Sequence, residues 1–453
     1  MTPFSRLSRL APALALALST AVPVAPGPAI AAGGSAAAAS VRATRVTLAN
    51  GLRVVLAPDS QASAVDAALW IRSGSRHEST ARTGLALLCA RLTFRNGSAD
   101  PLAPLAAEGG TGAIAVTPDF TSFSTTVPAE GLHVALAFLA ERLPGKPVAP
   151  AELAAERAAF HAERSRPERT PVVRALGRLW NTAWAGHPYA RTGGTPPATS
   201  DATTVATVDA WRRERFQPGN AVLTIAGSFD PERALADVRA RFERLPRGTT
   251  AGASASRAVA ARGPARASER MELPARLCLV GWRGPGAADP DAPALELLAT
   301  WLGNGSQARL HTSLVHDWGL AITTQAGFLP QQDGSLLWTL AVVPPDADSA
   351  AVERTLLDAA KGITQRAPEA FELERARRQL ESAVWFGLQT ARQRGQALGE
   401  AEMLAGDAAA ASRRLEALSQ VTPEDLRRVA MRVMTDAGRA TVWMLPSSAG
   451  AAR

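Results

Sequence analysis

The 453-residue sequence is poor in cysteine and aromatic residues and lacks several signatures of known chemistry. It contains two cysteines, one tyrosine and 5% aromatic residues. It has no glycine-rich phosphate loop, no G-x-S-x-G nucleophile signature and no basic block interleaved with aromatic residues. After the first thirty residues, no apolar run is long enough to span a bilayer. These absences argue against a P-loop nucleotide site, a serine hydrolase, a nucleic-acid partner and a stable membrane span.

Cys89 and Cys278 lie far apart in the sequence, each in an apolar stretch. That setting is typical of a cysteine buried as a small hydrophobic residue, so we expect two unpaired thiols. A disulfide between them in an oxidising compartment stays open, because the sequence does not show whether they approach within bonding distance.

The rest of the composition is that of a globular protein with more than one domain. Hydrophobic residues make up 46% and charged residues 20%, and the length exceeds that of one ordinary core. The net charge is +8, but arginine alternates with acidic residues through most predicted helices, as in residues 151–169. We therefore interpret the excess charge as solvated helix surface.

The first 31 residues have the pattern of a secretory signal peptide. Arg6 and Arg9 precede the apolar stretch Ala11–Val22, and Ala29-Ile30-Ala31 forms a small-residue cleavage site. We exclude residues 1–31 from the fold and expect a secreted protein located in the periplasm.

The first half, residues 43–246, has the pattern of strands followed by helices. Asn50-Gly51 between two alternating segments predicts a hairpin, and residues 65–71 predict a third strand. Further predicted helices span 84–95, 131–143 and 151–166, and further predicted strands span 120–127 and 221–226.

The second half, residues 269–446, repeats this order after a linker predicted at residues 247–268, which is rich in Gly, Ala, Ser and Arg. Each half ends alike, because Val205–Asp209 and Val421–Asp425 each precede a helix with paired arginines and then a strand. The duplication predicts an α+β fold of two tandem homologous domains, each a mostly antiparallel sheet with helices packed on one face.

A series of short motifs occurs in an order that resembles the insulinase/pitrilysin family of zinc peptidases, whose two-domain members include bacterial processing peptidases. The resemblance covers about residues 43–446 and implies that the two domains form a clasp. The motifs are Asn50–Val54, Gly74–Arg76 with Glu78, Gly84–Ala86, Glu108–Gly110, Asp119 with Thr121, His187–Tyr189, Pro218–Val222, Arg309–Leu310, Gly319–Ala321 and Val421–Asp425.

In that family, the helix that begins at Gly84 carries the inverted zinc motif H-x-x-E-H. The resemblance places Leu87, Ala90 and Arg91 at its catalytic positions. Leucine and alanine cannot bind zinc or accept a proton, and arginine carries a permanent positive charge. We therefore expect no catalytic residue at these positions.

The resemblance also implies that the third zinc ligand survives as Glu163, seven residues after Glu156. One ligand of three does not hold a catalytic zinc, so we expect no metal and no cofactor. Glu163 either forms an ion pair with Arg91 in place of the metal or is solvated.

In paired relatives, one subunit carries zinc and the other carries an Arg and a Tyr that hold substrate. The resemblance places those positions at Val315 and Ile322, so both groups are lost, and Tyr189 is the only tyrosine in the chain. The edge strand that pairs with substrate backbone in the family falls on Thr111, Gly112, Ala113, Ile114 and Ala115.

The sequence therefore predicts a non-catalytic subunit that forms a heterodimer with a zinc-motif homologue in periplasmic peptide degradation or processing, with unfolded peptides as ligands. One alternative is a divergent metalloendopeptidase that uses Glu156, His161 and Glu163. Another is a stand-alone peptide-binding or assembly protein. His311, His316 and Asp317 also have a metal-like composition, which we interpret as ordinary surface groups.

Overall fold

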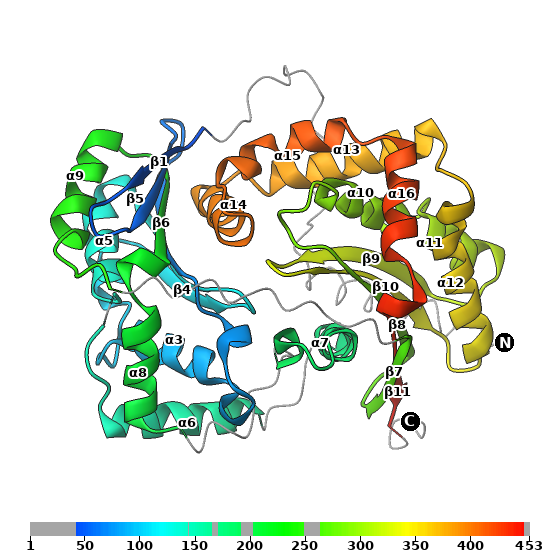
Figure 1. The fold of residues 1–453 in the computed structure, drawn as a ribbon, viewed down its shortest axis with the longest axis horizontal. Coiled ribbons are helices and arrows are strands. Elements are labelled where there is room, and N and C mark those ends of the chain that lie inside the picture. The colour runs from blue at the N-terminus through cyan, green and yellow to red at the C-terminus, as the bar shows by residue number, and fades with distance from the viewer. Residues whose placement is uncertain (1–41, 144, 165–170, 192–202, 249–262, 448–453) are drawn as a thin grey trace.

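Two β-sheets organise the chain, one in each half, and they stand side by side in Figure 1. The computed structural model describes residues 42–143, 145–164, 171–191, 203–248 and 263–447. The predicted signal peptide lies outside the described residues, so it stays a prediction.

The first sheet has six strands in the order β1-β2-β6-β3-β5-β4. Neighbouring strands are antiparallel except β2 and β6, which run parallel. One face shares an apolar core with helices of the same half. The strands are β1 (Thr44–Thr47), β2 (Arg53–Pro58), β3 (Ala64–Ile71), β4 (Thr111–Val116), β5 (Thr121–Pro128) and β6 (Ala221–Gly227). The helices of this half are α3 (Leu85–Arg95), α4 (Ala103–Ala107), α5 (Leu132–Ala140), α6 (Pro150–Arg164), α7 (Pro171–Ala183), α8 (Val205–Arg215) and α9 (Pro231–Phe242).

The second sheet has five strands in the order β7-β11-β8-β10-β9. Only β7 and β11 run parallel. Its strands are β7 (Ala265–Met271), β8 (Arg276–Gly284), β9 (Thr323–Pro330), β10 (Ser335–Val343) and β11 (Arg439–Pro446). Its helices are α10 (Ala292–Gly303), α11 (Arg309–His311), α12 (Ser349–Gln365), α13 (Ala370–Phe386), α14 (Ala391–Leu404), α15 (Ala409–Ser419) and α16 (Pro423–Val433).

Several single turns complete the chain. The 3-10 helices are η1 (Ser75–His77), η2 (Thr80–Arg82), η3 (Ala129–Gly131), η4 (Pro188–Arg191), η6 (Pro218–Asn220) and η8 (Asp436–Gly438), and η7 (Thr312–Asp317) is a π-helix.

The two sheets repeat one pattern of strand pairing. The order β2-β6-β3-β5-β4 corresponds to β7-β11-β8-β10-β9, with the parallel pair at the same place in each. The helices follow in matching order, so α3 corresponds to α10, α6 to α13 and α7 to α14. The predicted α+β fold of two similar, mostly antiparallel units is confirmed.

Each sheet is covered on its second face by a helix from the other half. α14 packs on β3 and β6, where Leu398 joins Trp70 in one apolar cluster. A side chain at Gly399 would clash with the Trp70 indole, so this glycine permits the close contact. α7 packs on β8 and β11, where Leu179 joins Val442, and Figure 1 shows α7 beside the second sheet. The sequence predicted the helices on one face of each sheet but not this exchange, which ties the halves together.

The predicted linker, residues 247–268, lies mostly outside the described residues, but its last part differs from the prediction. β7 begins at Ala265, four residues before the predicted domain start at 269. Its residues alternate between half-buried and exposed positions and include two arginines and a glutamate. β7 is an edge strand that pairs only with β11 in the described part of the chain. Edge strands often carry charged residues, so the sequence of β7 looks like that of a linker.

Cys89 and Cys278 are buried and unpaired, one in the core of each half. Within the described residues, no helix combines the length and the apolar character needed to cross a membrane.

Candidate functional site

The candidate site lies where α3 packs against α6. α3 begins after Gly84, whose φ of 88° is in the left-handed region that glycine favours. The carboxylate of Glu78 accepts hydrogen bonds from the backbone N–H groups of Gly84 and Ala86, each at 2.8 Å. Because these bonds satisfy two amides of the first turn, they fix the start of α3 and orient the three positions that the resemblance assigned to zinc chemistry.

Arg91 joins the two helices through two carboxylates. Its Nη1 donates to both carboxylate oxygens of Glu163 at 2.9 Å, and its Nε contacts Oε1 of Glu156. Arg95, one turn later, lies 3.3 Å from Oε2 of Glu156. The Arg91 guanidinium also lies 4.8 Å from the ring centroid of Phe160. Glu163 was expected either to pair with Arg91 or to be solvated, and the structure shows the ion pair with Arg91.

The two carboxylates differ sharply in exposure. The Glu156 side chain is 2% exposed, whereas that of Glu163 is 43% exposed and that of Arg91 22%. A buried carboxylate requires an opposite charge beside it, while an exposed pair contributes little to stability. The Arg91–Glu156 contact is therefore the structural part of the site, and Glu163 caps it from the solvent side.

The other two positions that the resemblance assigns to the zinc motif supply no ligand. Ala90 is fully buried in the core of the first half, and Leu87 packs against the same core. A catalytic zinc needs three protein ligands with lone pairs, whereas this set offers a methyl group, an isobutyl group and a cation bound to both glutamates. The residues present do not fit zinc.

The other metal-like sets do not form a site either. In the part of the chain that the structure describes, no group of three His, Cys, Asp or Glu side chains is arranged to hold a metal ion. His311 and His316 face each other with ring centroids 5.1 Å apart, but Asp317 completes no such group with them. Glu156 and Glu163, which the metalloendopeptidase alternative requires beside His161, are both engaged by Arg91.

The residues predicted as the substrate-pairing edge, Thr111 to Ala115, lie in β4, which ends the first sheet. Among the described strands, β4 pairs only with β5. The Thr117 N–H donates to the Phe120 carbonyl at 2.8 Å, so residues 117 and 120 are a hydrogen-bonded pair. Along an antiparallel strand, residues alternate between bonding to the neighbouring strand and facing away from it. The N–H and C=O groups of Gly112, Ile114 and Val116 therefore face the open edge.

The two predicted substrate-holding positions lie in apolar surroundings. Val315, in η7, packs against the core that α10 and α12 share, and Ile322 packs against the cluster around α7. Neither side chain can donate or accept a hydrogen bond, so neither replaces the Arg and Tyr found in paired relatives.

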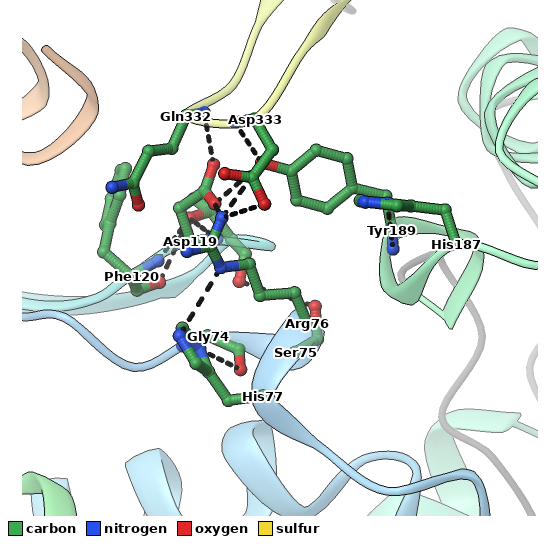
Figure 2. A network of polar contacts seen from close by, with 11 residues as sticks. Gly74, Ser75, Arg76, His77, Asp119, Phe120, His187, Tyr189, Gln332 and Asp333 are labelled. Atoms are coloured by element: carbon green, nitrogen blue, oxygen red, sulfur yellow. Dashed lines mark hydrogen bonds and ion pairs between the residues drawn. The ribbon is translucent and has the colours of Figure 1, made fainter. Parts of the chain in front are cut away.

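A buried polar network that the sequence analysis missed joins the two halves (Figure 2). Arg76 Nη1 lies 2.9 Å from Asp119 Oδ1 and 2.8 Å from Asp333 Oδ2. The Tyr189 hydroxyl donates to Asp119 Oδ1 at 2.9 Å and accepts from the Asp333 N–H at 2.9 Å. The Gln332 N–H donates to Asp119 Oδ2 at 2.9 Å. Asp333 and Gln332 form the tip of the β9–β10 hairpin, so three first-half side chains hold a second-half turn.

The electrostatics of this network follow from its burial. Burial raises the pKa of Asp119 despite the hydrogen bonds and the Arg76 charge that oppose the rise. Burial also raises the pKa of Tyr189, with the Asp119 charge adding to it, so the phenol stays neutral and can donate. Burial opposes the charge of Arg76, but Asp119, Tyr189 and Asp333 together hold its pKa above the ordinary value. Each of Arg76, Asp119 and Tyr189 belongs to a motif noted in the sequence, but only the fold shows that they meet.

Known proteins resemble this chain over most of its length. A chain described as an uncharacterized zinc protease of Streptomyces coelicolor is 26% identical over 403 residues, which are 86% of this chain and 87% of that one. A solved structure described as a protease from Helicobacter pylori matches with a TM-score of 0.81 at 21% identity, covering 90% of this chain and all of that one. A chain of Complex III2 from Candida albicans, with Inz-5 bound, matches with a TM-score of 0.75 at 15% identity, covering 89% and 95%.

Two family models cover successive parts of the chain. The model described as insulinase (peptidase family M16) matches residues 53–196, and the model described as peptidase M16 inactive domain matches residues 203–380. Together they cover every strand of the two sheets except β1 and β11, and they include the α3–α6 site and the β9–β10 hairpin. The chain therefore belongs to the insulinase (M16) peptidase family.

Proposed function

We propose that this chain is a non-catalytic subunit of peptidase fold that binds unfolded peptides beside a zinc-bearing homologue. The observation that carries the proposal is the Arg91 guanidinium between Glu156 and Glu163. In a zinc peptidase, the metal lowers the pKa of a bound water and polarises the scissile carbonyl. A guanidinium holds no water as a ligand and does not lose its proton, so it supplies neither effect.

Peptide binding needs only the backbone of β4. The outward N–H and C=O groups of Gly112, Ile114 and Val116 can pair with an extended peptide whatever their side chains are. A partner would supply zinc and also substrate-holding groups, because Val315 and Ile322 offer none.

A heterodimer in the periplasm agrees with two further observations. Residues 1–31 have a signal-peptide pattern. One solved structure with this fold comes from a multisubunit assembly, Complex III2. The partner in this proposal is a homologue that retains H-x-x-E-H.

Co-expression with such a homologue from the same genome tests the proposal. We expect a stable one-to-one complex that cuts long unfolded peptides, and less cutting when Ile114→Pro removes one outward N–H from β4. Ile114→Ala is the matched control, because it loses the same side chain but keeps the N–H.

The alternatives predict different results. Near one zinc per purified chain, with chelator-sensitive cutting by the chain alone, would favour a divergent metalloendopeptidase. A homologue that cuts equally well alone and never co-elutes would favour a stand-alone binding protein.

Rebuilding the metal site gives a second test. The combined change Leu87→His, Ala90→Glu and Arg91→His should give zinc binding measurable by elemental analysis, because Glu163 already lies beside position 91. Absence of zinc in a folded variant would mean that the surroundings no longer orient these ligands.

A further inference from the structure

Three arginines of the first sheet lie under the end of α14. Arg45 in β1 pairs with Val55 of β2, and Arg53 lies two residues before Val55 on the same strand. Arg72 lies two residues after Trp70, directly past the end of β3. Side chains alternate between the two faces of a sheet, and Val55 and Trp70 belong to the apolar cluster that α14 covers. The three arginines therefore lie on the face beside which Figure 1 shows α14.

One buried carboxylate of the second half meets these arginines. The Glu402 side chain, near the end of α14, is fully buried, and its Oε1 accepts from Arg53 Nη1 at 2.7 Å and from Arg45 Nη1 at 3.4 Å. The Glu402 backbone carbonyl accepts from Arg72 Nη2 at 3.4 Å. We call Arg45, Arg53, Arg72 and Glu402 the arginine cluster. Because two guanidiniums reach the same oxygen, one small ligand can contact both.

The arginine cluster has more positive than negative charge. It combines three guanidiniums with one carboxylate. Asp407 forms its ion pair with Arg413, which is the main cause of its lowered pKa, and the charge of Arg45 adds a smaller part. Asp66, on the same face, lies near the start of β3 rather than at its end. Among the described residues no other carboxylate pairs with the three arginines, so two positive charges have no counter-ion.

Burial makes this excess of positive charge unfavourable. It lowers the pKa of Arg53 to about 10, with the charges of Arg72 and Arg45 adding to the fall and that of Glu402 opposing it. Burial also lowers the pKa of Arg72, and the Nε–H of this side chain is buried without an acceptor among the described residues. An anion beside the arginine cluster would offset the repulsion between the guanidiniums and accept hydrogen bonds from unused N–H groups.

The arginine cluster is open to solvent on the side of Arg45. The Arg45 side chain is 51% exposed, that of Arg53 is 20% exposed and that of Glu402 is 0% exposed. A ligand that arrives from solvent therefore meets the two guanidiniums before it meets the carboxylate.

We propose that the arginine cluster binds a tetrahedral dianion of the phosphate class between Arg45 and Arg53. Two uncompensated positive charges match a phosphoryl group, whereas a carboxylate would neutralise only one of them. The planar fork of a guanidinium also fits two oxygens of a phosphate. β1 and β4 are the opposite edges of the first sheet, so this site is separate from the peptide edge and goes beyond the proposed function. Because Glu402 belongs to the second half, the bound anion lies at the junction of the two halves and stabilises it.

Isothermal titration calorimetry of the isolated mature chain with sodium phosphate tests the site. The titration is done at about pH 8, where phosphate is mostly a dianion, with sodium chloride keeping the ionic strength constant. We expect phosphate and sulfate to bind at least about tenfold more tightly than acetate. Arg45→Gln should weaken phosphate binding about fivefold or more.

The matched control is Arg178→Gln on α7. Arg178 is 44% exposed, against 51% for Arg45, and lies 3.9 Å from Glu269 beside the second sheet. The control removes the same charge from an arginine of similar exposure next to the other exchanged helix, and phosphate binding should not change.

Glu402→Gln separates an anion site from a set of counter-ions. Removing the competing carboxylate should strengthen phosphate binding about fivefold or more, and phosphate should raise the Tm of this variant more than that of the parent. If the arginines serve only to neutralise Glu402 and to bind carbonyls at the end of α14, the variant loses stability and gains no affinity for phosphate.

A phosphoryl group can be free or part of a lipid headgroup. Flotation with phosphatidylcholine vesicles that contain phosphatidic acid distinguishes the two sources. Phosphate binding without flotation assigns a soluble phosphate, and flotation that Arg45→Gln abolishes assigns the headgroup. Absence of both, equal affinity for acetate and phosphate, or no effect of Arg45→Gln would overturn the proposal. The proposed function would be unaffected, because none of these variants changes β4.

Discussion

The two halves repeat one fold, but the spaces beside their corresponding helix pairs differ: one holds ion pairs and the other is a cavity. Between α3 and α6, Arg91 forms ion pairs with both Glu156 and Glu163, so both carboxylates already have a cation beside them. Beside α10 and α13, a cavity of about 2040 Å³ runs along β9. Ion pairs therefore fill the space between the helices in the first half, whereas a cavity lies beside the corresponding helices in the second half. The fold here does not need a metal, because the Arg91 guanidinium supplies the opposite charge that the buried Glu156 carboxylate requires.

The faces that receive the exchanged helices also differ. Under α7 the buried contact consists of apolar residues, and its polar part lies at the rim, where Arg174 and Arg178 pair with the half-buried Glu269 of β7. Under α14 the apolar cluster is accompanied by polar groups: Glu402, fully buried, pairs with Arg53 at 2.7 Å, and Asp66 accepts from Thr126 at 2.9 Å. The contact of the first sheet with α14 should therefore respond to pH, and that of the second sheet with α7 should not.

The strongest test of the comparison breaks the joint between the halves. Asp119→Ala removes the acceptor for Tyr189 and Gln332 and leaves Arg76, which is 8% exposed, with Asp333 as its one remaining carboxylate among the described residues. We expect a loss of about 3–5 kcal/mol in the free energy of unfolding, measured with urea, because a buried charge loses a partner. Hydrogen exchange at the amides of Gln332 and Asp333 should accelerate.

The control for this change is a surface pair in the second half. Lys361→Ala removes an exposed cation 2.9 Å from Asp436, with side chains that are 36% and 58% exposed, and should cost under about 1 kcal/mol. Equal losses from both variants would mean that the network does not join the halves.

The second prediction concerns Asp66 beneath α14. Burial raises its pKa to about 7, against the opposing hydrogen bond from Thr126 and the charge of Arg392. The folded state then binds this proton more tightly than the unfolded state. The contribution to stability is fully present below about pH 4 and is lost as the pH rises through about 7.

Asp66→Asn keeps the shape but cannot ionise. At pH 8 the variant should exceed the parent by about 2–4 kcal/mol in the free energy of unfolding, and at pH 4 the two should agree. Urea titrations across this range give the difference. A constant difference at every pH would show that Asp66 does not ionise on unfolding.

The third prediction removes the cation of the α3–α6 site. Arg91→Ala leaves the buried Glu156 with Arg95 as its remaining cation, so we expect a loss of about 1–3 kcal/mol in the free energy of unfolding. Arg378→Ala on α13, the helix that corresponds to α6, removes an arginine that is 75% exposed and should cost under about 0.5 kcal/mol. Similar losses would mean that Arg91 is only a surface residue.

Local patterns predicted most elements but not how the elements meet. The spacing over residues 84–95 predicted α3, because apolar side chains recur along its core face. α7 has such a face too, but a periodic pattern does not say which sheet covers it, so the exchange onto β8 and β11 was invisible. β7 was read as linker because charged residues alternate along an exposed edge.

The candidate site shows the same limit. The sequence itself shows Leu87, Ala90 and Arg91 at the positions that the resemblance assigns to the zinc motif, and none of these side chains is a zinc ligand. The meeting of Arg76 and Asp119 with a turn more than two hundred residues away could not be predicted from the sequence, because it depends on the packing of the two halves. Glu156 was noted as the residue seven positions before Glu163 and as a ligand in the metalloendopeptidase alternative. Its burial, which the sequence did not reveal, makes it the more important of the two for stability.

The smallest expected effect sharpens the contrast between an ion-pair site and a metal site. Glu163→Gln and Glu156→Gln, made as two separate variants, each replace one carboxylate of α6 with a neutral amide. Glu163 is 43% exposed, so its loss should cost under about 1 kcal/mol, whereas loss of the Glu156 charge should cost about 1–3 kcal/mol because Arg91 loses its buried partner. In a zinc site the order would be reversed, since the residue at position 163 would be the ligand and metal binding would be linked to folding. Thermal and urea unfolding with and without added zinc show which variant loses more stability. A larger loss of stability in Glu163→Gln than in Glu156→Gln, changed by added zinc, would contradict the ion-pair interpretation of this site.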